Sequence, residues 1–448
     1  MKINKFFIST FLCLVVWATF LPNAQLGAAG TTFRQQKDTA LKVFDAVVDI
    51  SGQGDYTDVQ QAIDHAPQHL TRPWRIFIKK GDYEGLIRIP ENKPYIYLIG
   101  EDKDKTIISF KINCADPANT GDAGQQYSKL RYDQQDCAVV VVNAPDFYAQ
   151  NISFVNAYGV TAQKGPQALA MKVTADRSAF FNCRFRSFQD TWMTSTKGLN
   201  DRTYANDCWI EGAVDYFYGG GNAFIDHCTL YNVRGGSVIV APRHLEGTKW
   251  GYVFSHCIID GNKAAADGRT KLGRPWHDAP MAVYLNTILK IPINPEGWTD
   301  MGPAAKLFAE YNTRDQNGRL VDLSKRRTWY KQSKGEGGKI IQGLQAVLTK
   351  KEAAAYTYTN VVEGKDRWDP RKFFEQLRAP EHLMLDKQDL KWKRLKEAGG
   401  YLVALNGQIL GVTTHNFFKI SGSAVGVWTV TGVKNNGSLG KSATLQGR

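Results

Sequence analysis

The chain has 448 residues and a formal net charge of +13, and 43% of its residues are hydrophobic. This length allows one large domain and one small one, and the polar, glycine-rich composition with many strand-forming residues is typical of a soluble β-rich protein. After the first thirty residues there is no long apolar run, which excludes a protein with several membrane spans.

The first thirty residues have the pattern of an export signal. Two lysines precede an apolar run over residues 6–21, and small residues follow at 27–30. A secretory signal peptide has this order, and the run is short for a membrane anchor. We therefore predict a signal peptide at residues 1–29 and an exported protein, located in the periplasm, at the cell surface or in the medium.

The positive charge predicts an acidic partner. Removing the signal removes two lysines and no acid, so the exported chain stays strongly basic. We find no basic helix and no nucleic-acid-binding motif, so an acidic polysaccharide fits better than a nucleic acid. Charge that serves only solubility is the alternative.

Six cysteines remain after the signal, and export permits disulfides. Their spacing alone does not give the pairs. A bridge between Cys114 and Cys137 would pin the long polar segment between them, which otherwise has the character of a loop.

The first predicted elements are one short helix and several short strands. A capping box with Thr57 at the cap and Gln60 three residues later predicts a helix to Ala66. Turn residues separate the apolar runs that we predict as strands, at 44–50, 74–78, 86–89, 95–99 and 106–110.

A repeated pattern follows, in which a Cys or Asn stands between apolar residues. The anchors are Asn151, Cys183, Cys208, Cys228 and Cys257, at intervals of 32, 25, 20 and 29 residues. A constant core pattern with variable insertions is typical of a solenoid. We predict an all-β fold, a right-handed parallel β-helix, with the cysteines stacked mainly as core residues. A β-sandwich is the alternative fold.

Polar residues gather on the segments that follow the anchors. Gln189 lies six residues after Cys183, and Asp215 lies seven after Cys208. Equivalent positions on neighbouring rungs of a β-helix are roughly 5 Å apart. We therefore expect Asp190 and Asp215 to lie close together although they are far apart in the chain.

Several motifs resemble those of the pectin methylesterase family, over about residues 48–370. They include Gln167-Ala168-Leu169, Gln189-Asp190-Thr191, Val214-Asp215-Tyr216 and Leu272-Gly273-Arg274-Pro275-Trp276. The resemblance implies a β-helix enzyme that removes methyl groups from esterified polygalacturonate, with no cofactor and no metal. Its implied partner is methyl-esterified homogalacturonan, with no nucleic acid and no membrane span, and we expect a monomer.

The resemblance also implies the role of each site residue. Asp215 would be the nucleophile, Asp190 the acid and then the base, and Arg274 the cation that holds Asp215 ionised. Gln167 and Gln189 would donate to the oxyanion, which is what ester hydrolysis requires. The aromatic side chains that would contact the sugar are Trp276, Trp298 and Tyr218. Singly, each of these residues has an ordinary structural explanation.

Departures from the family pattern concern the surroundings of these groups. The family usually has Asp-Phe-Ile-Phe-Gly at the nucleophile, where this chain has Asp215-Tyr216-Phe217-Tyr218-Gly219, and Trp192 replaces a leucine. We expect these changes to alter the subsite walls. A disulfide between Cys208 and Cys228, as the family sometimes has near its nucleophile, and free stacked thiols both remain open.

Later segments predict helices and then a second β unit. A capping box at Thr349 and Glu352 starts one helix, and Asp369-Pro370 starts another that we expect to pack outside the stack. Asn406-Gly407 between alternating apolar runs predicts a hairpin. We predict a catalytic domain at residues 30–378 and, at 379–448, a small β-sandwich resembling fibronectin type III-like units, which could bind carbohydrate, space the enzyme or aid secretion.

Two other functions remain as alternatives. A polysaccharide lyase is also often a β-helix on the same polymer, but lyases need a base and commonly calcium with acidic clusters. The second alternative is a non-catalytic binder of acidic polysaccharide or a thioesterase-like protein. The set of amides, carboxylates and guanidinium favours ester hydrolysis.

Overall fold

The computed structural model describes residues 34–35, 42–114, 137–195, 197–422 and 425–447. The predicted signal peptide lies outside these residues. Among the described residues, no helix has the length and apolar character needed to cross a membrane.

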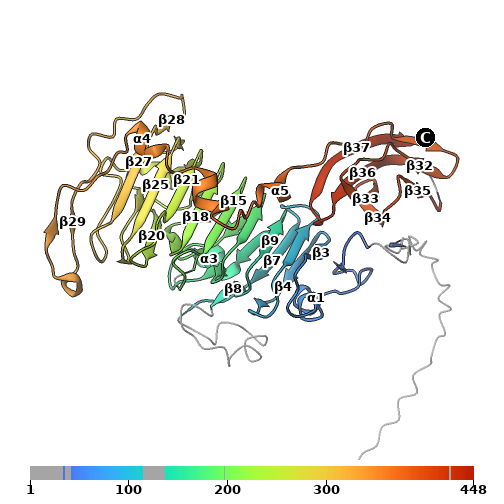
Figure 1. Ribbon diagram of the computed structural model, residues 1–448, viewed down its shortest axis with the longest axis horizontal. Helices are drawn as coiled ribbons and strands as arrows, with labels where there is room; N and C mark the ends of the chain where they lie inside the picture. Colours follow the sequence, from blue (N-terminus) through green and yellow to red (C-terminus); the bar gives the residue numbers. More distant parts are fainter. Residues whose placement is uncertain (1–33, 36–41, 115–136, 196, 423–424, 448) are drawn as a thin grey trace, which may run out of the picture. The chain divides into compact units, whose positions relative to one another are not determined.

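Three parallel sheets are stacked as a β-helix, as the sequence predicts (Figure 1). The first sheet runs β2 (Ala46–Val48), β3 (Trp74–Ile78), β6 (Ile96–Gly100), β9 (Phe147–Gln150), β12 (Ser178–Phe181), β15 (Arg202–Asn206), β18 (Asn222–Asp226), β21 (Tyr252–Ser255), β25 (Met281–Leu285), β27 (Leu307–Tyr311). The second runs β4 (Gly81–Glu84), β7 (Thr106–Phe110), β10 (Ser153–Asn156), β13 (Arg184–Arg186), β16 (Trp209–Gly212), β19 (Thr229–Asn232), β22 (Ile258–Gly261), β26 (Ile288–Leu289), β28 (Arg314–Asp315).

The third sheet is the one that carries the polar motifs. It runs β5 (Ile87–Ile89), β8 (Ala138–Val142), β11 (Leu169–Val173), β14 (Trp192–Met193), β17 (Val214–Gly219), β20 (Val238–His244), β23 (Lys271–Gly273), and β24 (His277–Asp278) also pairs with β20. Each rung contributes one strand to each sheet, so equivalent residues of successive rungs become neighbours.

The repeat of the sequence is present, but its first anchor is displaced by one residue. The strand register pairs Ser153 with Arg184, so Ile152 and not Asn151 lies beside Cys183. Asn151 belongs to a different stack at the turn after the first sheet, where each residue has a left-handed backbone. Its members are Asn151, Asn182, Asp207, His227, His256, Asn286 and Asn312. Asparagine tolerates this conformation, and the Asn182 side chain donates to Asn151 across 2.8 Å.

The four cysteines that follow this turn are buried and free. The alternative of a disulfide between Cys208 and Cys228 is therefore wrong in this structure. Their contact is a hydrogen bond, in which the Cys208 backbone N–H donates to the Cys228 sulfur over 3.3 Å. The stacked thiols serve as small core residues, as the repeat indicates.

The interior of the β-helix is apolar, and aromatic rings fill the rungs around β14. The Trp192 ring packs on Phe185 with centroids 4.1 Å apart, and Phe180 and Phe217 meet it edge-on. The short helices lie outside this interior. They are α1 (Val59–Asp64), α3 (Ala157–Ala162), α4 (Lys350–Ala353) and α5 (Arg371–Phe374), with single turns η2 (Lys263–Asp267), η3 (Lys334–Glu336) and η4 (Thr359–Glu363).

The helix predictions hold with two changes at the ends of α1, which ends at Asp64 and not at Ala66 and has a different cap. Asp58, and not Thr57, caps α1, because its side chain accepts from the Gln61 N–H at 2.8 Å. The capping box at Thr349 is present as predicted. The segment with α5 covers the outer face of the first sheet, where Phe374 stacks on Tyr204 with centroids 5.1 Å apart.

The C-terminal residues form two small antiparallel sheets. One contains β33 (Ala398–Leu405), β34 (Gln408–Thr413), β36 (Gly426–Lys434) and β37 (Leu439–Gly447), with β1 (Arg34–Gln35) parallel to β34. The other contains β31 (Met384–Asp386), β32 (Asp389–Lys391) and β35 (Phe417–Lys419), and a short hairpin of β29 (Tyr330–Lys331) and β30 (Ile340–Ile341) precedes both. The predicted Asn406-Gly407 turn joins β33 to β34. The domain boundary near residue 379 stays a prediction.

Candidate active site

The five predicted polar residues line one pocket on the third sheet. Its volume is about 130 Å³, and its walls are Gln167, Gln189, Asp190, Asp215, Tyr218, Ala241, Arg274, Trp276 and Met301. Met301 comes from the loop between β26 and β27, and the others come from β11, β14, β17, β20 and β23 or from the turns beside them. Parallel stacking therefore brings together groups that are more than a hundred residues apart in the chain.

The two aspartates occupy equivalent positions on neighbouring rungs. The register pairs Trp192 with Phe217, which places Asp190 opposite Asp215. The Asp190 N–H also donates to the Val214 carbonyl at 2.9 Å. Both aspartates have a left-handed backbone, with φ of 62° and 48°. The register shift in β17 right after Val214 fits a bulge, which redirects side chains out of the regular alternation.

Arg274 binds Asp215 through two hydrogen bonds. Its Nε donates to Oδ1 at 2.8 Å and its Nη2 donates to Oδ2 at 2.5 Å. Asp215 is only 5% exposed. The guanidinium fork therefore holds the carboxylate in one orientation and supplies the positive charge that a buried carboxylate needs.

The two carboxyl groups differ in their electrostatic surroundings. Burial raises the pKa of Asp190 well above its usual range, and the charge of Asp215 raises it further. Burial also raises the pKa of Asp215, but the hydrogen bonds and charge of Arg274 act in the opposite direction. This arrangement favours a protonated Asp190 beside an ionised Asp215, which is the pairing that acid catalysis next to a nucleophile requires.

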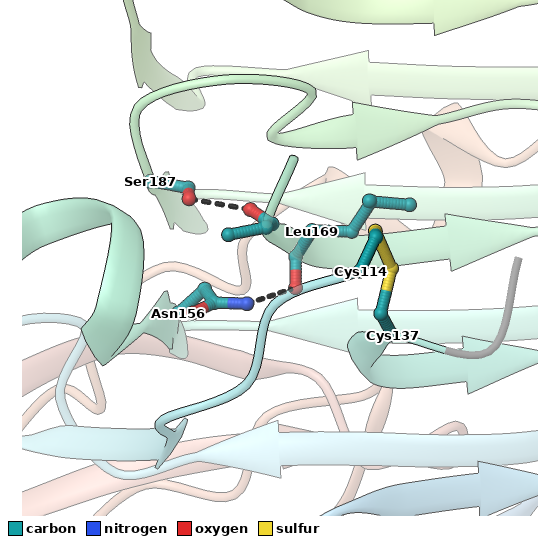
Figure 2. The surroundings of a disulfide bond; sticks show 6 residues. Cys114, Cys137, Asn156, Leu169 and Ser187 are labelled. Atoms are coloured by element: carbon teal, nitrogen blue, oxygen red, sulfur yellow. Dashed lines mark hydrogen bonds between the residues drawn. A yellow bond between two sulfur atoms is a disulfide. The ribbon is translucent and has the colours of Figure 1, made fainter. Parts of the chain in front are cut away.

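Backbone hydrogen bonds hold the segment that carries Gln167. The carbonyls of Gln167, Ala168 and Leu169 accept from the Cys114 N–H at 2.9 Å, the Ser187 hydroxyl at 2.5 Å and the Asn156 amide at 3.0 Å. Figure 2 shows the last two bonds beside the disulfide that joins Cys114 to Cys137. The bridge that we predicted is present, and it ties the start of β8 to the segment of Gln167.

Trp276 and Tyr218 form one side of the pocket. Their rings meet edge-to-face with centroids 5.5 Å apart, and the Arg243 guanidinium lies 5.9 Å from the centre of the Trp276 ring. Trp276 is partly exposed, so a sugar ring can reach it. Two of the pocket walls, Ala241 and Met301, are not predicted from the sequence. Ala241 lies opposite Arg274 in the register of β20 and β23, so its pairing with a predicted site residue could have identified it. Met301 lies in a loop, and no pattern in the sequence marks it.

Trp298 does not reach the pocket. Its side chain is fully buried, and its ring packs on Phe308 with centroids 4.7 Å apart. A ring enclosed in the core has no free face for a sugar, so its predicted place in the substrate site is wrong in this structure.

Trp192 and Tyr216 also face the interior. Both are fully buried, and neither is among the pocket walls. The Tyr216 hydroxyl donates to the Asn232 side chain at 3.3 Å. The expectation that these two residues alter the subsite walls is wrong, and of the departures at the nucleophile only Tyr218 lines the pocket.

One group of potential metal ligands lies outside the pocket, among the described residues. The ligand atoms of Asp226, His227 and His256 lie within 4.8 Å of one another. The two imidazole rings are stacked with an interplanar angle of 7°, so their nitrogen lone pairs lie in parallel planes and do not converge on one point. Asp226 accepts from the Tyr204 hydroxyl. We assign the histidines to the stack of turn residues.

Comparison with known proteins identifies the family. The pectinesterase family model matches residues 45–365, which is more than half of the chain. The chain belongs to the pectinesterase family. Pectinesterase 31 of Arabidopsis thaliana is 34% identical over 58% of this chain and 79% of its own length. A pectinesterase of Petunia integrifolia is 30% identical over 67% of this chain and 78% of its own length.

Solved structures of pectin methylesterases share the fold. The enzyme from carrot superposes with a TM-score of 0.59 at 24% identity, covering 72% of this chain and 94% of its own. The enzyme from Erwinia chrysanthemi has a TM-score of 0.57 at 22% identity and covers 73% of this chain and 98% of its own. The chain is thus a pectinesterase with a β-helix fold, and the substrate of its family is pectin.

Proposed function

We propose that the pocket hydrolyses methyl esters of homogalacturonan with Asp215 as nucleophile and Asp190 as acid and base. The observation that carries this proposal is the pairing of the two aspartates on neighbouring strands, with only Asp215 bound by Arg274. The difference in electrostatic surroundings supports different roles for two identical side chains.

The reaction would proceed in two steps. An Asp215 oxygen attacks the carbonyl carbon of the methyl ester, and the amides of Gln167 and Gln189 donate to the oxyanion that forms. The carbon–oxygen bond to the methoxy group then breaks while Asp190 passes its proton to that oxygen, releasing methanol. In the second step Asp190 takes a proton from water as the water oxygen attacks the acyl carbon of the anhydride, and the bond to Asp215 breaks to regenerate its carboxylate. The carboxylic acid product then gives its proton to solvent.

The finer choice of substrate rests on the pocket and the charge. The partly exposed Trp276 offers an aromatic face to a sugar ring, and the basic chain suits a polymer that carries carboxylates. We also propose that the protein is exported, because a disulfide such as that of Cys114 and Cys137 is typical of oxidising compartments.

The test is to incubate the full-length protein with methylated pectin and to measure methanol, acid and unsaturated products. Methanol and acid in equal amounts, without a new double bond, are expected. Unsaturated product without methanol would instead indicate a lyase, and binding without turnover a non-catalytic protein. Asp215→Asn should abolish methanol release while the fold and pectin binding persist, and undiminished turnover by this variant would reject the nucleophile.

A further inference from the structure

The Tyr218 hydroxyl is a buried polar group that the mechanism above leaves unused. Tyr218 is 2% exposed and lines the catalytic pocket. Its hydroxyl has no partner of good hydrogen-bond geometry among the residues that the structure describes. Because buried hydroxyls are nearly always paired, an unpaired one at a reaction centre needs an explanation.

The position of Tyr218 is fixed by its strand and by its neighbours. It lies in β17 three residues after Asp215, and the register places it opposite Met193, three residues after Asp190. Its ring is held edge-on against Trp276. The hydroxyl is therefore enclosed beside the pocket, on the strand that carries Asp215 and next to the strand that Asp190 precedes.

The charges around the hydroxyl make it a donor. Burial raises the pKa of Tyr218 well above its ordinary value, and the charges of Asp190 and Asp215 act in the same direction, so the hydroxyl keeps its proton. Three groups act on Asp190, namely Asp215, Arg274 and Tyr218, and hydrogen bonding from Tyr218 lowers the pKa of Asp190. Asp215 already receives both donors of the Arg274 fork. Among the residues that the structure describes, no arginine forms such a fork with Asp190.

We propose that Tyr218 is a positioning residue for Asp190, and that its hydroxyl donates a hydrogen bond to the Asp190 carboxylate once Asp190 has given up its proton. This inference rests on the proposed function. A protonated Asp190 is a weaker acceptor for the hydroxyl than the carboxylate is. When the proton leaves with methanol, a negative charge forms beside the hydroxyl, and the bond tightens. The hydroxyl thereby makes Asp190 a better acid.

The test compares Tyr218→Phe with Tyr216→Phe. Each change removes one buried hydroxyl from β17, but the Tyr216 hydroxyl bonds to Asn232 and lies outside the pocket. Tyr218→Phe keeps the ring and removes a hydroxyl without a good partner, so we expect an unchanged melting temperature. Both variants are assayed for methanol release from methylated pectin across the pH range.

For Tyr218→Phe we expect kcat to fall roughly tenfold with KM within about twofold of the wild type. The basic limb of its pH profile should move to higher pH, because Asp190 loses the bond that favours its ionised form. Tyr216→Phe should keep the wild-type profile. Adding Tyr218→Phe to an Asp190→Asn variant should have no further effect on the residual rate.

Two outcomes would overturn the inference, an unshifted profile for Tyr218→Phe or the same shift in Tyr216→Phe. If the unshifted profile of Tyr218→Phe comes with a raised KM, the hydroxyl contacts the sugar instead. A wild-type protein that releases no methanol would instead overturn the proposed function and the inference with it. An active wild type beside an unshifted variant would overturn the inference alone.

Discussion

Replacing Arg274 with alanine would remove the cation that holds the proposed nucleophile. Two charge-assisted hydrogen bonds, at 2.8 and 2.5 Å, would be lost from Asp215, which is 5% exposed. Each such bond contributes about 1.5–3 kcal/mol, but the carboxylate can avoid part of the loss by taking up a proton. We therefore expect a loss of about 3 kcal/mol in transition-state stabilisation, which is roughly two orders of magnitude in kcat/KM.

The pH profile should identify the cause. Arg274 lowers the pKa of Asp215 both by hydrogen bonding and by its charge. Without it, the acidic limb of kcat/KM should move to higher pH, because the nucleophile must be ionised. Arg274→Lys keeps the charge but not the fork, so it should restore part of the rate and of the limb. Methanol release measured across pH, with purified variants that retain the wild-type circular dichroism, tests both expectations.

A matched control is available on the neighbouring sheet. The Nε of Arg186 contacts both oxygens of Glu211, at 3.2 and 3.1 Å, between β13 and β16. Arg186→Ala removes an arginine–carboxylate pair of similar form outside the pocket, so it should retain the wild-type kcat/KM and pH profile. If Arg274→Ala keeps the wild-type rate and acidic limb, or if Arg186→Ala loses as much activity, the reasoning about Asp215 is refuted.

Three further predictions follow from burial and cross-linking. The folded-state pKa of Asp190 lies above its ordinary value, so the contribution of Asp190 to stability is greatest below about pH 4 and falls as the pH rises. The gain in melting temperature from Asp190→Asn should therefore be larger at pH 7 than at pH 4. An equal gain at both pH values would contradict this. Serine at both Cys114 and Cys137 should lower the free energy of unfolding in denaturant by roughly 3 kcal/mol, because the bridge closes a loop with a sequence separation of 23, and an unchanged midpoint would show that it does not stabilise the fold. Trp276→Ala should raise KM with little change in melting temperature, because Trp276 is a partly exposed wall of the pocket. Trp298→Ala should instead lower the free energy of unfolding by about 3–5 kcal/mol, because its ring is buried in the core. The reverse pair of effects would contradict the positions of the two rings.

Much of the architecture could be predicted because a β-helix repeats one pattern. The short apolar runs and their turn residues predicted most early strands, and the cysteine anchors predicted the stacking. The predictions from this repeat were incomplete or displaced where a rung does not follow the repeated pattern. Past Trp298 it fades in the sequence, yet β27 and β28 extend the first two sheets there. The first anchor was off by one residue, since Asn151 suits either position in the sequence pattern and only the strand register, which pairs Ser153 with Arg184, decides between them.

The sequence by itself determined the set of proposed reactive groups, because ester hydrolysis needs these residue types and the motifs that carry them follow the repeat of the rungs. It also placed Asp190 opposite Asp215. Only the tertiary structure decided which aromatic rings face the pocket. A register shift and the left-handed backbone of Asp215 interrupt the alternation in β17, so Tyr218 lines the pocket while Tyr216 is enclosed. Trp298 lies in a later segment, and its packing on Phe308 encloses it. Where the alternation of a strand is interrupted, the direction of a side chain depends on how neighbouring rungs pack, and a local sequence pattern does not carry this information.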